Sequence, residues 1–510
     1  MFEWILIAGF IFAFITSCGI GANDVANSFA TSVGAQVLTL RSALVIAAIF
    51  ELLGAILMGS RVTDTIRKGI VDPDVFNNDI YTLMYGMLCA SMATGIWLFI
   101  ATYFKAPVST THSTVGAIMG FAMVYTGENG QFKTGIDWNK VGLIVASWII
   151  SPMIAGTFTV ILLSFTKYFV LNNSQPVKRG LMVFPFMIWF TFSVICFFVI
   201  YKGTPQTGLD DTPLGMAIGI SIGFGFIIAI CAYGIVKFYL YDKIMNSDDY
   251  STFIFSKFKQ NSPVKIINKL GIENTVMETN IDDLLISDDI IIMNEIDIET
   301  QSNTSDKKHI FSNSKFTKME LFDPKAEKLY SYLQLVTACV SAFAHGSNDI
   351  ANSIAPLAAI YTIYRDNAID SKSDVPLWIL AVGGAGIVVG LYLWGWRIIE
   401  RIGKDLSGVT PSRGFSIELG AAMAVVLASR LEIPVSTTHC QVGSIVGSGL
   451  TDSFGQGLRK GLSNIRHNGL PNVDLKVFLK ILLAWVVTLP VTMALSATLF
   501  SFGYYSPDRV

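Results

Sequence analysis

The sequence predicts an all-helical membrane protein that crosses the bilayer many times and consists of two related halves. Three observations support this prediction. Of its 510 residues, 52% are apolar and only 15% are charged, against about a quarter charged in an ordinary soluble domain. Apolar stretches long enough to span a bilayer recur along the chain. Two polar motifs also occur twice, in the same order.

A hydrocarbon core of about 30 Å requires about 20 apolar residues in helical form. Alternation typical of a membrane β-barrel is absent, so we expect helical spans, and about 10–12 crossings or part-crossings. We predict that the first apolar stretch is a retained helix, since it lacks the preceding basic residues of a secretory signal. Full-length candidates lie near 3–20, 40–59, 81–104, 140–170, 181–201, 214–240, 376–396, 414–430 and 474–503, and shorter ones near 113–125, 329–344 and 440–450.

Charged residues concentrate in the middle of the chain. Between positions 241 and 328 lie 11 Lys/Arg and 16 Asp/Glu, among many Asn and Ser residues. We interpret 241–328 as a hydrophilic, mostly disordered loop. The chain then divides into a first repeat (1–170), additional transmembrane helices (171–240), this loop, and a second repeat (329–510). The net charge of −2 gives no reason to expect a nucleic-acid partner.

The repeated motifs indicate an internal duplication. Residues 21–28 read GANDVANS and residues 346–353 read GSNDIANS, while PVSTTH occurs at both 107–112 and 434–439. The distance from Asn23 to Pro107 is 84 residues, and that from Asn348 to Pro434 is 86. Internal repeats with polar interruptions at matching positions point to a transporter with its binding site near the membrane midplane.

The N-D-x-x-N pattern has the ligand types of a cation site. Asp24 and Asn27 are three residues apart, as are Asp349 and Asn352, so each pair would share one helix face. A carboxylate within a bilayer is usually retained for function or pairing. Carboxylate and amide oxygens suit hard cations such as sodium. The alternative is a set of polar contacts between packed helices.

The P-V-S-T-T-H pattern predicts an anion site. Proline favours the first helical turn and Ser or Thr favours the cap, so a helix would begin in each motif. Its free backbone N–H groups and positive dipole end attract an anion. Lys105 and Glu432 occupy matching positions, so neither is a strong ligand candidate. The alternative is a proline kink with Ser and Thr bonded back to carbonyls. The predicted anion ligands are Ser109, Thr110, Thr111, Ser436, Thr437 and Thr438.

Other polar residues fit either a coupling role or a structural one. Glu51 and Glu418 are acids inside apolar stretches and have no acidic counterpart in the other repeat. His112, His345 and His439 adjoin the motifs, and proton transfer or helix packing would explain them equally well.

At these motifs the chain resembles the PiT family of inorganic phosphate transporters, over about 1–170 and 329–503. The resemblance implies inverted repeats with broken or re-entrant helices and phosphate held between them by the hydroxyls above. It implies sodium at Asp24, Asn27, Asp349 and Asn352, with Asn23 and Asn348 beside them. It also implies extracellular termini, a cytosolic central loop, and a transport role for Glu51 and Glu418. A further acidic position of eukaryotic members falls at Met87, which weakens any coupling role assigned there.

We therefore expect a secondary symporter for phosphate, coupled to sodium, in a lipid bilayer and by default the plasma membrane. Proton coupling, a passive channel or exporter, and a phosphate-sensing receptor are the alternatives. An enzyme is not expected because no nucleophile–base pair or metal cluster is apparent, and no ATP-binding loop motif occurs. We expect no cofactor, only transported phosphate and sodium. A homodimer remains an open expectation.

Overall fold

The computed structural model describes residues 2–76, 79–131, 135–201, 208–209, 211–245, 320–368, 375–400, 408–455 and 473–506. These ranges are helical, with connecting turns and a single isolated β-bridge between Val71 and Ile136. They belong to one compact unit. Most of the predicted hydrophilic loop lies outside the described residues. Its ends differ from the prediction, because residues 241–245 and 324–328 are helical.

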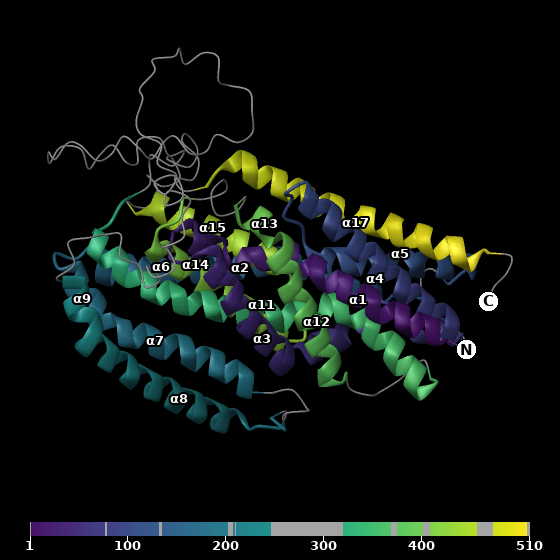
Figure 1. The fold of residues 1–510 in the computed structure, drawn as a ribbon, viewed down its shortest axis with the longest axis horizontal. Coiled ribbons are helices and arrows are strands. Elements are labelled where there is room, and N and C mark those ends of the chain that lie inside the picture. The colour runs from purple at the N-terminus through teal and green to yellow at the C-terminus, as the bar shows by residue number, and fades with distance from the viewer. Residues whose placement is uncertain are drawn as a thin grey trace, which may run out of the picture. The chain divides into compact units, whose positions relative to one another are not determined.

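The two repeats have matching series of helices (Figure 1). In the first repeat these are α1 (Glu3–Asn23), α2 (Val25–Gly34), α3 (Leu40–Gly69), α4 (Ile80–Tyr103), α5 (Thr110–Glu128) and α6 (Trp138–Thr166). Between the repeats lie α7 (Pro176–Ile200), α8 (Leu214–Ile235) and α9 (Tyr241–Met245). The second repeat has α11 (Pro324–Asp366), α12 (Leu377–Gly390), α13 (Trp396–Glu400), α14 (Pro411–Arg430), α15 (Thr437–Phe454) and α17 (Leu475–Tyr504).

Eight helical stretches of the described chain are long and apolar enough to cross a membrane. They are Glu3–Gly34, Leu40–Arg67, Ile80–Tyr103, Trp138–Leu171, Pro176–Ile200, Leu214–Met245, Leu377–Ile399 and Leu475–Tyr504. The predicted span near 414–430 is α14, which is not among them. This helix carries Arg413, Glu418 and Arg430, and nearly all its residues are buried. Most residues of α5, α11 and α15 are buried as well.

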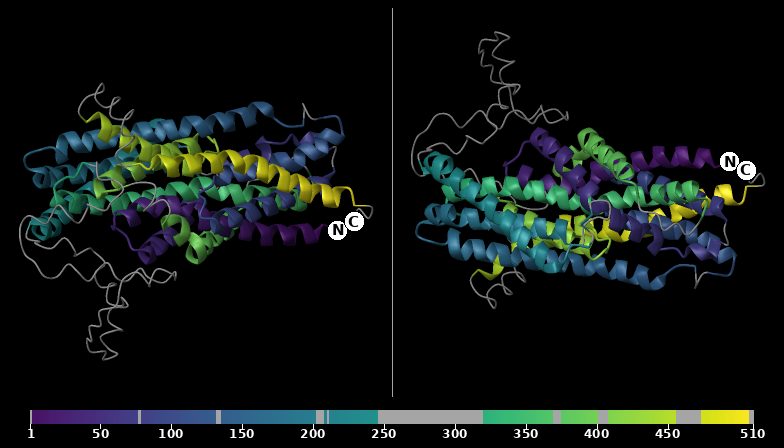
Figure 2. Two further views of the ribbon diagram at one scale, coloured as in Figure 1. Left: turned by 90° about the horizontal axis from the view of Figure 1, so that it is seen from above. Right: turned by 90° about the horizontal axis from the view of Figure 1, so that it is seen from below.

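The repeats are inverted. Figures 1 and 2 show α1 and α11 running in opposite directions, with both termini at one end of the helices and α9 at the other. Helices α4 and α5 form one hairpin, here called hairpin 1, and α14 and α15 form hairpin 2. Each hairpin turns through a residue in the left-handed region, Lys105 (φ 55°) or Glu432 (φ 60°). These matching charged residues therefore shape the turns, as glycine often does at helix C-termini.

Capping residues set where matching helices begin. Asp137 accepts a hydrogen bond from the Lys140 backbone N–H before α6, and Asp474 does the same for Lys476 before α17. The Lys140 N–H stabilises the ionised carboxylate, which holds the pKa of Asp137 below its ordinary value. Side-chain caps of this kind stabilise a helix start by about 1 kcal/mol.

Glycine in the repeated G-x-N-D motif allows close helix crossings near the site. A Cβ added to Gly346 of α11 would collide with the Glu51 carbonyl oxygen of α3. A Cβ added to Gly21 of α1 would collide with the Ile387 carbonyl oxygen of α12. Small residues let membrane helices approach backbone to backbone. Met87, where relatives were expected to carry an acid, lies in an apolar cluster around α4 and α5 and is 3% exposed.

Candidate functional site

The tips of the two hairpins meet in the interior. Helix α5 begins at Thr110 with Ser109 as its cap, and α15 begins at Thr437 with Ser436 as its cap. The Thr111 hydroxyl donates to the Val435 carbonyl at 2.9 Å, and the matching Thr438 hydroxyl lies 3.4 Å from the Val108 carbonyl. Both helix starts agree with the prediction. The prolines differ, because each precedes the cap and lies outside the first turn.

Asp24 lies at the break between α1 and α2, opposite the hairpin tips. One carboxylate oxygen accepts a hydrogen bond from the Thr438 hydroxyl at 2.6 Å. The other accepts from the Thr110 backbone N–H at 3.3 Å, at the positive end of α5. Asp24 and Asn27 were predicted to share one helix face, and the structure adds that the helix is interrupted at Asp24 itself. The Asn27 side chain lies outside the described residues.

Asp349 occupies the matching place on α11, where the helix is continuous. Its carboxylate accepts from the Thr437 hydroxyl at 2.5 Å. Asn352, one turn further along, donates to the Thr110 hydroxyl at 2.9 Å and lies 3.4 Å from Asp349. Predicted cation ligands and predicted phosphate ligands therefore form one hydrogen-bonded cluster that joins both repeats.

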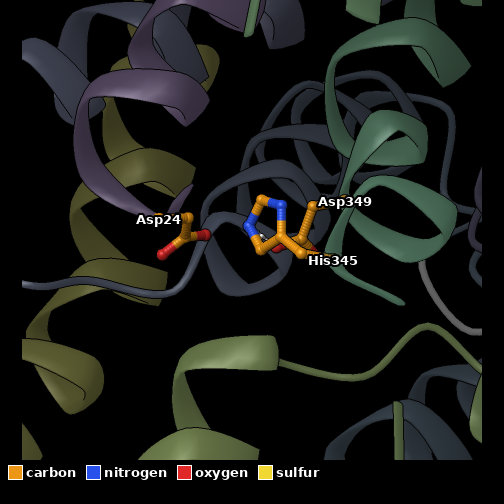
Figure 3. Close-up of side chains that lie close together, drawn as sticks. All are labelled: Asp24, His345 and Asp349. Carbon is orange, nitrogen blue, oxygen red and sulfur yellow. Dashed lines mark ion pairs between the residues drawn. The ribbon is translucent and has the colours of Figure 1, made fainter. Parts of the chain in front are cut away.

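His345 lies between three carboxylates. Its Nδ1 atom is 2.7 Å from Glu51, and its Nε2 atom is 2.8 Å from Asp349. Ligand atoms of Asp24, His345 and Asp349 lie within 4.8 Å of one another (Figure 3). All four side chains are at most 2% exposed. Two carboxylates this close in a buried place repel each other unless a cation or a proton lies between them.

Asn23 and Asn348 hold the hairpin tips. The Asn23 amide donates to the Thr102 hydroxyl and the Ala106 carbonyl, each at 3.0 Å, and accepts from the Val108 N–H. The Asn348 amide lies 3.2 Å from the Ser429 hydroxyl, the counterpart of Thr102. These asparagines fix the backbone of the hairpin tips, from which the site threonines project. They therefore support the site and do not belong to the carboxylate cluster.

Other predicted candidates lie apart from the carboxylates. The Ser109 and Ser436 hydroxyls accept from the backbone N–H groups of His112 and His439 as helix caps. The His112 and His439 rings contact each other, with centroids 4.7 Å apart. Each ring also packs on a matching tryptophan, Trp148 or Trp485, with centroids 3.7 Å apart. We therefore assign the two histidines to packing. Glu418 lies in a separate cluster of hydroxyls on α2 and α11.

The structure adds three polar residues that sequence reasoning missed. A small cavity beside His345 and Thr437 is also lined by Ser28, Ser341 and Gln441. Each lies four positions from a predicted site residue: Ser28 from Asp24, Ser341 from His345, and Gln441 from Thr437. Polar residues one helical turn from a motif residue share its face, and that signal was available in the sequence.

The chain is similar to phosphate transporters over nearly its whole length. A family model described as "Phosphate transporter family" matches residues 20–496. "Putative phosphate permease" of Chlamydia trachomatis serovar D is 34% identical, over 98% of both chains. "Sodium-dependent phosphate transporter 1-A" of Danio rerio is 30% identical, over 98% of this chain and 95% of that protein. A solved structure titled "The sodium-dependent phosphate transporter" superposes with a TM-score of 0.72, at 29% identity and 98% coverage of both chains.

Proposed function

The chain belongs to the phosphate transporter family, and we propose that it is a secondary symporter that moves inorganic phosphate together with sodium. As a member of this family it is an integral membrane transporter and not an enzyme. The proposal adds the sodium coupling, the site residues and the orientation in the membrane.

The proposed coupling rests on one observation. The hydrogen-bond donors suited to phosphate already donate to carboxylates in this structure. Thr438 and the Thr110 N–H donate to Asp24, and Thr437 donates to Asp349. A cation that binds these carboxylates takes over their oxygen lone pairs. The hydroxyls and the N–H at the start of α5 then become free to donate to phosphate oxygens. Cation binding thus creates the anion site.

Electrostatics gives the size of this coupling. Two unit negative charges 4 Å apart repel by about 4 kcal/mol at an effective dielectric constant of 20. Phosphate beside an ionised Asp24 or Asp349 would therefore bind on the order of a thousand-fold more weakly without a cation. The same two carboxylates that repel phosphate attract the cation. Each substrate therefore requires the other, which is the condition for symport.

Sodium is the proposed cation because the available ligands are carboxylate, amide and hydroxyl oxygens. Two similar proteins are named sodium-dependent phosphate transporters, which supports the same choice. Proton coupling is the second candidate, and the bridge from Glu51 through His345 to Asp349 favours it. A proton on His345 would neutralise one negative charge of the same cluster.

The distribution of basic residues supports an orientation. In the described chain, exposed basic side chains gather where α7 and α17 begin and where α8 ends, at the α9 end of the helices. The termini end has Lys140 and Arg365. Cytoplasmic loops carry the excess of Lys and Arg, so we place the α9 end in the cytosol and the termini outside a plasma membrane. The exposed residues at the α9 end include Lys178, Arg179, Lys237, Lys476 and Lys480.

The test is uptake of labelled phosphate by the purified protein in liposomes, under an inward sodium gradient and, separately, an inward proton gradient. Concentrative uptake with sodium alone is expected. Concentration under the proton gradient alone would move the coupling to groups such as His345. Phosphate that equilibrates without concentrating under either gradient would contradict symport and favour a passive channel.

Matched variants connect the result to the site. Asp24→Asn and Asp349→Asn should abolish sodium-driven concentration, because an amide gives no negative charge to the cation. Asp366→Asn is the control, since Asp366 pairs with exposed Arg365 at the end of α11. Sodium-driven uptake that survives both site substitutions would place the cation elsewhere.

A further inference from the structure

Glu418 of α14 lies in a buried pocket of hydrogen-bond donors. Its Oε1 atom accepts from the Thr31 hydroxyl at 2.7 Å, from Ser32 at 2.5 Å and from the Gln334 amide at 3.0 Å. Its Oε2 atom accepts from the Thr337 hydroxyl at 2.7 Å. Glu418 and all four donors are at most 1% exposed.

These donors are neutral, and they come from both repeats. Thr31 and Ser32 are on α2, and the other two are on α11. Glu418 forms no ion pair with the residues that the structure describes. Hydroxyl and amide donors also hold the carboxylates at the hairpin tips. A carboxylate and a phosphate oxyanion present the same kind of acceptor oxygen to such donors.

A small cavity lies between this pocket and the site around His345 and Thr437. Its walls include Ser28, one turn before Ser32 on α2, and Ser341, one turn after Thr337 on α11. They also include Ala422, one turn after Glu418 on α14. At its other side the cavity reaches His345 and Thr437. On α2, Ser28 lies between Asp24 and Ser32, and on α11, Ser341 lies between His345 and Thr337. A serine hydroxyl is therefore present on each helix between the carboxylates at the hairpin tips and the pocket of Glu418.

In the other repeat, the positions that match the four donors are glycine or apolar. Aligning the repeated motifs places Ser91 opposite Glu418, Gly9 opposite Gln334 and Phe12 opposite Thr337. Pro356 and Leu357 lie opposite Thr31 and Ser32. A side chain at Gly9 would contact Ile360 and Leu357, so apolar groups fill that side. The four donors therefore have no polar counterparts on the hairpin 1 side.

We propose that Thr31, Ser32, Gln334 and Thr337 form a second, transient binding site for an oxyanion such as inorganic phosphate, and that Glu418 occupies this site in the present structure as a tethered substitute for the substrate. The inference rests on the proposed function and deepens it. Phosphate leaving the central site toward the α9 end must displace the Glu418 carboxylate from its donors. While Glu418 is seated, its negative charge closes the route to anions.

The experiment counts labelled phosphate bound to the purified full-length protein at saturating sodium, by scintillation proximity. The unchanged protein should bind one phosphate, at the central site. Glu418→Ala empties the second site and should bind two. Glu418→Gln is the matched control, because an amide of the same size still fills the pocket and the count should remain one. Adding Thr31→Val and Thr337→Val to Glu418→Ala should return the count to one.

A folded Glu418→Ala variant that binds a single phosphate with unchanged affinity would overturn the proposal. Phosphate at the central site reports folding in the same sample. Thermal unfolding in detergent is a second readout for a variant of low stability. Phosphate should raise the Tm of Glu418→Ala more than that of Glu418→Gln, and equal shifts would also overturn the proposal. Absence of any sodium-dependent binding to the unchanged protein would instead contradict the proposed function.

Discussion

The Thr438 hydroxyl donates a hydrogen bond to Asp24 at 2.6 Å, across 414 positions of sequence. Its neighbour Thr437 donates to Asp349 at 2.5 Å. Two adjacent threonines at the start of α15 thus hold one carboxylate from each repeat. Hairpin 2 therefore responds to whatever binds either carboxylate, and this connects cation binding to the position of the hairpin.

Removing the Thr438 hydroxyl should weaken phosphate binding. Thr438→Val keeps the shape of the side chain but removes a donor that phosphate would use once a cation holds Asp24. A hydrogen bond to a charged group contributes about 1.5–3 kcal/mol, which is on the order of 10–100-fold in affinity. Phosphate binding at saturating sodium measures the effect. Thr498→Val is the control, since exposed Thr498 donates only to a carbonyl of its own helix. Equal affinity in both variants would remove Thr438 from the phosphate ligands.

A side chain at Gly346 should separate α3 from α11. Gly346→Ala places a methyl group against the Glu51 carbonyl oxygen, and overpacking of this kind destabilises by about 1–3 kcal/mol. We expect a lower Tm in detergent together with reduced uptake, because Glu51 and His345 lie at this crossing. Gly219→Ala on α8 is the control, since nothing lies within 4 Å of a Cβ added there. A loss of stability in both variants would point to a general effect of alanine.

His345 should be more important for stability when both of its acidic neighbours are present. His345→Gln leaves Glu51 and Asp349 buried without the group between them. Removing one partner of a buried ion pair costs about 3–5 kcal/mol. The double variant with Glu51→Gln should recover part of this loss, because one uncompensated charge is removed as well. Thermal unfolding of the single and double variants measures this. Additive losses would mean that the 2.7 Å contact between His345 and Glu51 contributes no coupling energy.

The base of hairpin 2 should depend on the buried ion pairs of Asp452, which contacts both Arg413 and Lys167. Arg413 is fully buried and its Nε atom lies 2.8 Å from Asp452 of α15. Asp452→Asn leaves a buried guanidinium without its counter-charge, so we expect a loss of about 3–5 kcal/mol in the free energy of unfolding. Asp366→Asn breaks the more exposed pair with Arg365 and should cost at most about 1 kcal/mol. Similar Tm values for the two variants would contradict the structural role of the Arg413 pair.

Thiol labelling should reveal the proposed orientation. Glu128 is the last residue of α5 and Asn172 follows α6; both are exposed, and they lie at opposite ends of the helices. A membrane-impermeant maleimide added to intact cells should label Glu128→Cys and spare Asn172→Cys, in a chain whose exposed Cys231 has been replaced. Permeabilised cells provide the control, since both sites should then react. The opposite labelling pattern would reverse the assignment of the cytosolic end.

Several elements could be predicted because their signals are local. A long apolar run predicts a membrane helix wherever it occurs, and the spans near 3–20, 40–59 and 81–104 correspond to α1, α3 and α4. The Ser-Thr-Thr runs predicted helix starts, and caps at Ser109 and Ser436 agree with this. The repeated motifs predicted the duplication, and the matching series of helices agrees with it.

The remaining features depend on residues that are far apart in sequence. Periodicity could not show that the helix breaks at Asp24 while α11 continues through Asp349, because both motifs have nearly the same letters. From the sequence alone, Glu51, His345 and Glu418 were candidates for a coupling role without identified partners. Tertiary packing places His345 between Glu51 and Asp349, and surrounds Glu418 with donors from both repeats.

The sequence by itself determined the class of protein, its duplication and the kinds of ligand it carries, because composition and motif chemistry are properties of the chain. The tertiary structure decided which donor meets which acceptor. Buried polar groups must find partners, and the hairpin tips meet the carboxylates only when two inverted repeats close around them. That closure brought Thr438 to Asp24 and Thr337 to Glu418, contacts that no local pattern in the sequence could specify.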